Sequence, residues 1–148
     1  MAVTISLYNH TTRKLADQSL NFLSLKLMLL NNSATFNATH TALSGPAGAG
    51  NANQVSGNGW DAGGEALANV TVTSVNTNDA TFDADDVVVL ATGGPIGPAY
   101  KAVLYDDSDA NDAPLVFIDF GEAVSAGEST DFKIIWSANG IVRFDYTL

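Results

Sequence analysis

The residues best equipped for chemistry in this chain are the carboxylates of the segment Asp106–Asp112. Calcium prefers six to eight oxygen ligands, and the pattern Asp-x-Asp-x-Asn that starts at Asp107 resembles the opening of an EF-hand loop. However, Asp112 stands where that loop needs glycine, and Ile118 stands where it needs glutamate. We therefore expect a solvated acidic hairpin loop with no metal, and the same for the less specific run Asp83–Asp86.

The two histidines, His10 and His40, are the other candidates for catalysis or metal binding. Neither has a second ligand at helical spacing, and the chain contains no Gly-x-Ser-x-Gly nucleophile sequence. Pairs of acids suited to glycoside hydrolysis are numerous among 16 Asp and Glu residues, but no pattern selects one pair. The sequence thus predicts no enzyme, no catalytic residue and no cofactor.

Aromatic side chains offer a possible carbohydrate platform. Trp60, Trp136, Tyr100 and Tyr105 are of the type that stacks on sugar rings. Aromatics in β-proteins more often belong to the core or to an interface. The sequence is compatible with both interpretations.

The charge balance limits the classes of partner. Six Lys and Arg residues face 16 Asp and Glu residues, so the formal net charge is -10, and only 15% of residues are charged. Nucleic-acid binding and adhesion to anionic membranes both need clustered basic residues, so neither partner is expected. The most apolar stretch, Leu20–Leu30, is interrupted by polar residues and is too short for a membrane span, which needs roughly 20 residues. The absence of cysteine excludes disulfides and thiolate chemistry.

The elements that must position these residues are short strands. Apolar residues alternate with polar ones in segments that recur with turn signals between them. Eight such segments can be distinguished: Val3–Leu7, Leu23–Leu29, Ala66–Val75, Ala80–Leu90, Ala99–Tyr105, Leu115–Phe120, Phe132–Trp136 and Ile141–Tyr146. The pattern predicts one all-β domain over residues 1–148, an antiparallel sandwich or jelly roll with at most a short helix near the N-terminus.

Local details of this prediction can be tested. The four leucines of Leu23–Leu29 predict a strand with one buried face, and Asn139-Gly140 predicts a two-residue hairpin turn. The segment Phe36–Asn53 carries no charged residue. We expect it, together with Met1–Tyr8, to reach a neighbouring subunit and to order on contact.

The segment Gln54–Leu67 is the strongest structural signal. It holds four glycines and Trp60 within eight residues. Glycine is required where φ is positive or where backbones approach closely, so we expect a structural corner between strands rather than a phosphate-binding loop.

Taken in order, the sequence resembles small bacteriophage virion proteins of the capsid cement or decoration type, over nearly its whole length. In that family the glycine-rich bend carries an aromatic residue, often tyrosine, where Trp60 stands. The matching segments are Ile5–Asn9, Leu23–Leu30, Val55–Gly64, Lys101–Asp107, Ile118–Gly121 and Gly140–Arg143.

This resemblance implies a non-enzymatic, jelly-roll-like protein. It would be made in the cytoplasm of the host bacterium and would form a homo-oligomer on the capsid exterior. Its partners would be the major capsid protein and further copies of itself. The alternative is a carbohydrate- or receptor-binding module of the tail or neck. No individual contact residue follows from the resemblance.

Overall fold

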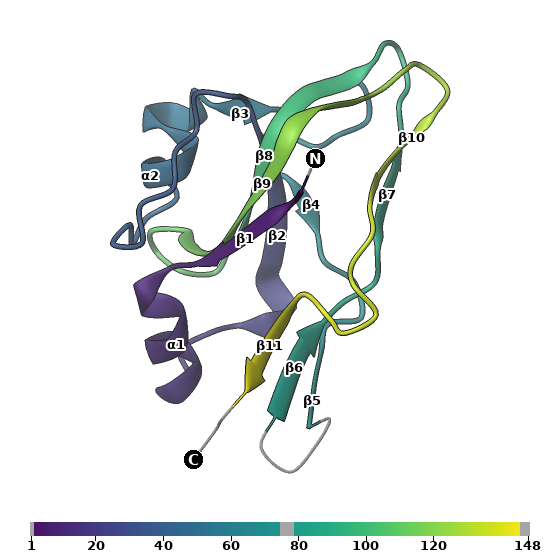
Figure 1. Ribbon diagram of the computed structural model, residues 1–148. Coiled ribbons are helices and arrows are strands. Elements are labelled where there is room, and N and C mark those ends of the chain that lie inside the picture. The colour runs from purple at the N-terminus through teal and green to yellow at the C-terminus, as the bar shows by residue number, and fades with distance from the viewer. Residues whose placement is uncertain (1, 75–78, 146–148) are drawn as a thin grey trace.

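The computed structural model describes residues 2–74 and 79–145, and its largest element is a six-stranded antiparallel sheet (Figure 1). Five of its strands lie in the order β1-β9-β8-β2-β3, and β4 also pairs with β2. Their bounds are β1 (Thr4–Leu7), β2 (Leu25–Leu30), β3 (Gln54–Val55), β4 (Glu65–Ala66), β8 (Ile96–Asp106) and β9 (Ala113–Ala126). The long hairpin of β8 and β9 is the centre of this sheet.

Two smaller antiparallel sheets form the facing layer. One has the order β10-β7 and the other the order β11-β6-β5. Their bounds are β5 (Thr71–Ser74), β6 (Asp79–Asp83), β7 (Val87–Leu90), β10 (Asp131–Ile134) and β11 (Val142–Asp145). The predicted class, an all-β antiparallel sandwich, is therefore confirmed.

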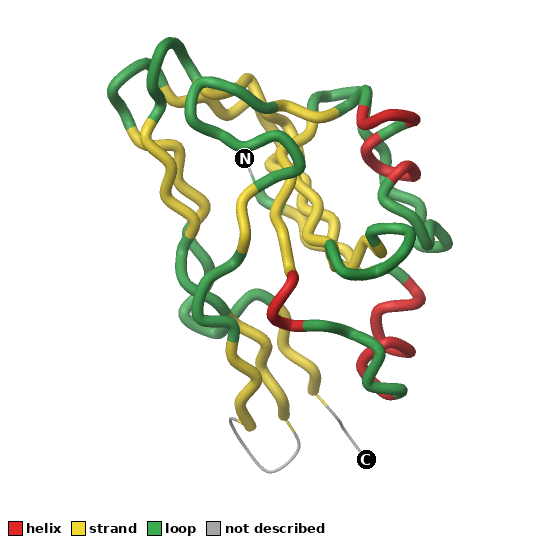
Figure 2. The backbone as a smooth tube through the Cα atoms, turned by 180° about the vertical axis from the view of Figure 1, so that it is seen from behind, coloured by secondary structure: helices red, strands yellow, loops and turns green. Residues whose placement is uncertain are grey.

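The helices lie on the other side of the six-stranded sheet, as Figure 2 shows from behind. The short helix expected near the N-terminus is α1 (Asn9–Ala16), and a four-residue helix, α2 (Ser44–Ala47), lies on the same side of the sheet. Two 3-10 turns complete the set, η1 (Phe22–Ser24) and η2 (Ala49–Asn51).

The six-stranded sheet is consequently buried on both faces. Leu25, Leu27 and Leu29 of β2 face the sandwich interior, whereas Met28 and Leu30 face the helices. The expectation of a single buried face was wrong, and Leu23 lies outside the strand with 93% of its surface exposed. A nearly continuous apolar run is typical of strands that are covered on both sides.

Two further local predictions were wrong about strand partners. The segment Ala80–Leu90 is two strands in different sheets, separated by residues 84–86. A turn does form there, but it spans Ser137–Gly140 with Ala138 and Asn139 at its centre, and its flanking strands do not form a hairpin. Instead, β10 pairs with β7 and β11 pairs with β6.

The uncharged segment Phe36–Asn53 is folded against its own molecule. Leu43 and Ala47 are buried in the core cluster on the helix side, and the Asn31 N–H donates to the Asn53 carbonyl at 2.8 Å. The idea that this segment orders only on contact with a neighbour is therefore wrong. The polar segment Asn76–Asp79, which the sequence indicates as a turn between two expected strands, lies mostly outside the described residues.

Candidate functional site

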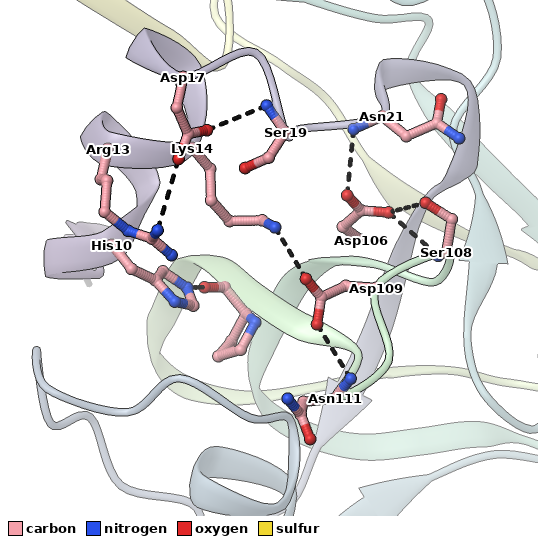
Figure 3. Close-up of polar contacts among 11 residues, drawn as sticks. His10, Arg13, Lys14, Asp17, Ser19, Asn21, Asp106, Ser108, Asp109 and Asn111 are labelled. Atoms are coloured by element: carbon pink, nitrogen blue, oxygen red, sulfur yellow. Dashed lines mark hydrogen bonds and ion pairs between the residues drawn. The ribbon is translucent and has the colours of Figure 1, made fainter.

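The acidic loop Asp106–Asp112 connects β8 to β9, and its first carboxylate is not solvated (Figure 3). Asp106 is 1% exposed. Its side chain accepts hydrogen bonds from the Asn21 N–H at 3.1 Å and from the N–H and hydroxyl of Ser108 at 3.0 and 2.6 Å. This carboxylate therefore fastens the segment before β2 to the hairpin, and the expectation of a solvated loop was wrong for this residue.

Two more acids of the loop are paired with lysines. Asp109 accepts from the Nζ of Lys14 at 2.8 Å, and Lys14, on α1, is 5% exposed. The hydrogen bond from Lys14, followed by that from the Asn111 N–H, holds the pKa of Asp109 below its ordinary value. Asp107 lies 2.9 Å from the Nζ of Lys26. The loop thus serves as an electrostatic clamp for α1 and β2.

The fourth acid, Asp112, has a different environment. It adopts a φ of 50°, where EF-hand loops have glycine. Burial, and then the nearby carboxylate of Asp107, raises the pKa of Asp112. Within residues 2–74 and 79–145, no group of three or more His, Asp or Glu side chains is arranged to hold a metal ion.

The clamp between Lys14 and Asp109 predicts a specific pH dependence. The pKa of Asp109 is lower in the folded state than in the unfolded state. The ion pair therefore stabilises the fold fully above the pKa that Asp109 has in the unfolded state. This stabilisation is lost as the pH falls through the pKa that Asp109 has in the folded state. Lys14→Met should cost about 1.5–3 kcal/mol of unfolding free energy at pH 7, as for a charge-assisted hydrogen bond. The difference from wild type should shrink in acid, as measured by urea denaturation between neutral pH and the acid limit.

Arg13→Met supplies the matched control. Arg13 lies one residue earlier on the same helix, and its ion pair with Asp17, at 3.4 Å, is solvent exposed. Exposed pairs contribute little, so this variant should change the unfolding free energy by less than about 1 kcal/mol. Equal losses in both variants would contradict the clamp.

The rings of the two histidines both pack near that of Tyr8. The ring of Tyr8 lies 6.3 Å from that of His10 and 6.4 Å from that of His40. The Nε2 of His10 donates to the Pro114 carbonyl at 2.5 Å, which ties α1 to β9. These contacts give His10 a structural role in the packing of the helix.

The four aromatic residues considered as a sugar platform are dispersed. Trp60 is buried in the sandwich interior, and Tyr105 is buried on the helix side, where its hydroxyl donates to the Gly63 carbonyl. Trp136 is half-buried, and its indole N–H donates to the Asp85 carbonyl at 3.0 Å. Because the two most deeply buried members lie on opposite faces of the sheet, the four do not form one platform.

Trp136 does line a groove that the sequence did not reveal. The groove lies between the edge of the six-stranded sheet and the segment that follows β10, with an empty volume of about 830 Å³ that includes open solvent. Val3 and Ile5 line one wall, and Ile135 and Trp136 line the other. Two features of the sequence pointed to the first wall: the apolar alternation in Val3–Leu7, and the expectation that Met1–Tyr8 reaches a neighbouring subunit.

All six basic side chains have a partner within the chain. Four form ion pairs with single carboxylates, Arg143 pairs with both Asp79 and Asp145, and Lys101 donates to the Asn32 and Ala34 carbonyls at 2.9 and 2.7 Å. The excess negative charge is therefore left to face solvent or a partner.

The comparisons with known proteins give no match: no family model, no curated protein and no solved structure is significantly similar to this chain. Among the described residues, no helix has the length and apolarity needed to cross a membrane.

Proposed function

We propose that this chain is a non-enzymatic structural protein of a bacteriophage virion, a cement protein that bridges major capsid subunits on the outside of the head. The resemblance described above motivates this assignment. The geometry favours binding over catalysis, because several of the titratable groups that the sequence offered hold the fold together. Asp106 and Asp109 join the hairpin to the N-terminal segments, and His10 joins α1 to β9.

The observation that carries the proposal is the pairing of all six basic side chains inside a chain of net charge -10. Such a surface repels nucleic acid and favours a neutral or basic protein surface. On a shell that carries many copies of the chain, multivalency would raise the total affinity for the capsid. The homo-oligomer of the chain would have closed symmetry, as most oligomers do.

The experiment that tests the proposal is immunogold labelling of purified virions with an antibody against this chain. Label over the head surface is the expected result. Label confined to the tail or neck would support the alternative, a carbohydrate- or receptor-binding module. That alternative is favoured by one observation, the half-buried Trp136 in an open groove. Purified virions without this chain would overturn both assignments.

A further inference from the structure

Strand β1 is a free edge of the six-stranded sheet. It pairs with β9 on one side, and no other described strand pairs with its other side. The Tyr8 N–H donates to the Leu115 carbonyl, which continues the ladder of β1 and β9. Ladder bonds alternate along an antiparallel strand, so Ser6 and Thr4 also bond to β9, whereas Ile5 and Leu7 direct their N–H and carbonyl groups outward.

The same odd-numbered residues present apolar side chains beside that edge. Val3 is 59% exposed and Ile5 is 48% exposed. Across the groove stands Ile135, which is 64% exposed, beside Trp136. We call the outward backbone of β1 and this groove the edge groove. It combines the two features of β-strand addition, unpaired backbone groups for affinity and side-chain pockets for specificity.

Glu122 and Lys133 are the charged residues that line the edge groove. Asp86 lies beside it, because its carboxylate accepts the backbone N–H of the lining residue Trp136 at 2.9 Å. The nearby cation, Lys133, is 3.5 Å from its own partner Asp131. A second copy of this chain would bring the same acidic rim and a net charge of -10, so charge complementarity favours a different, basic partner.

We propose that the edge groove binds an extended segment of another protein, which adds to β1 as an antiparallel strand, with alternating apolar side chains in the groove and lysine or arginine at its ends. The inference goes beyond the proposed function, because it follows from the edge and the groove whatever particle contains the chain. If the capsid assignment also holds, the segment belongs to the major capsid protein.

A designed peptide provides the test. It has three valines alternating with threonines and two lysines at each end, and its binding to the full chain is followed by fluorescence anisotropy. We expect saturable binding with slower hydrogen exchange at the amides of Ile5 and Leu7. A peptide with glutamate in place of lysine should bind about tenfold more weakly, which corresponds to about 1.4 kcal/mol.

Two variants locate the binding site. Ile5→Pro removes an outward N–H while leaving the bonds to β9, since proline is tolerated where an edge strand faces solvent. Ile135→Asn removes an exposed apolar wall. Each variant should bind the lysine peptide about tenfold more weakly. Leu23→Asn, which changes a side chain that is 93% exposed on η1, should bind the peptide as wild type does. Circular dichroism of each variant establishes that it is folded.

The proposal is overturned by any of three results. The lysine peptide does not bind, or it binds equally well to folded Ile5→Pro and Ile135→Asn variants, or the chain forms a dimer that Ile135→Asn dissociates. The last result would assign the edge groove to a second copy. None of these measurements uses virions, so failure here and failure of the immunogold experiment are distinguishable.

Discussion

Replacing Gly64 with alanine is expected to prevent stable folding. Gly64 has a φ of 92°, and an added Cβ would lie 2.3 Å from the carbonyl oxygen of Leu27 and 2.8 Å from the Cα of Met28. Both contacts are with the backbone of β2, which is held between β4 and β8 and cannot move aside without breaking their ladders. We expect the unfolding free energy to fall by about 3 kcal/mol or more, at the upper end of the effects of single substitutions.

Gly57→Ala is the matched control for this prediction. Gly57 lies in the same corner with a φ of 99°, but no heavy atom beyond its two chain neighbours lies within 4 Å of its added Cβ. The unfolding free energy of this variant should therefore fall by only about 1–2 kcal/mol, which is the conformational cost of placing a residue with a side chain in the left-handed region. Urea denaturation and soluble yield measure both variants. If the two glycine variants were equally stable, the prediction that the backbone of β2 excludes a side chain at Gly64 would be wrong.

These glycines show what the sequence could and could not predict about the corner. Their crowding indicated positive φ values, and Gly57, Gly59, Gly63 and Gly64 all have them. Which of them also lies against another backbone depends on the neighbouring strand, which is distant in sequence. For Gly59 the nearest atom to an added Cβ is the carbonyl oxygen of Leu90, at 2.5 Å.

Strand positions were more predictable than strand partners. Short apolar segments between turn signals located β1, β8 and β9, whether one face of the strand is covered or both. Partner choice is set by tertiary packing. The Asn139-Gly140 pair is a hairpin signal in the sequence, yet β10 and β11 on either side of it belong to different sheets.

The electrostatic clamp was hidden for a related reason. The acids of Asp106–Asp112 are evident from the sequence, but their partners are not. Lys14 is 95 residues from Asp109, and Asn21 is 85 residues from Asp106. A run of acidic residues is usually solvated. Because the partners are not visible in the local sequence, the pattern predicted a solvated loop rather than buried carboxylates. The edge groove was missed because its two walls are also far apart in the chain.

Trp60→Ala is the second variant expected to have a large effect. The side chain of Trp60 is 2% exposed, and its ring meets that of Phe132 on β10 edge to face, with centroids 5.4 Å apart. It therefore joins the glycine corner to the facing layer of the sandwich. Truncating a buried tryptophan to alanine typically costs about 3–5 kcal/mol, and we expect a loss in this range.

Trp60→Phe separates the packing of the ring from its polar atom. Within the described part of the chain, the buried indole N–H of Trp60 meets no acceptor, so phenylalanine removes an unsatisfied donor along with some volume. This variant should therefore retain most of the stability that Trp60→Ala loses. A double-mutant cycle with Phe132→Leu should give a coupling of about 0.5–1.5 kcal/mol, as for other aromatic pairs. A coupling near zero would show that the corner and β10 are stabilised independently, and that Trp60 acts through its buried area alone.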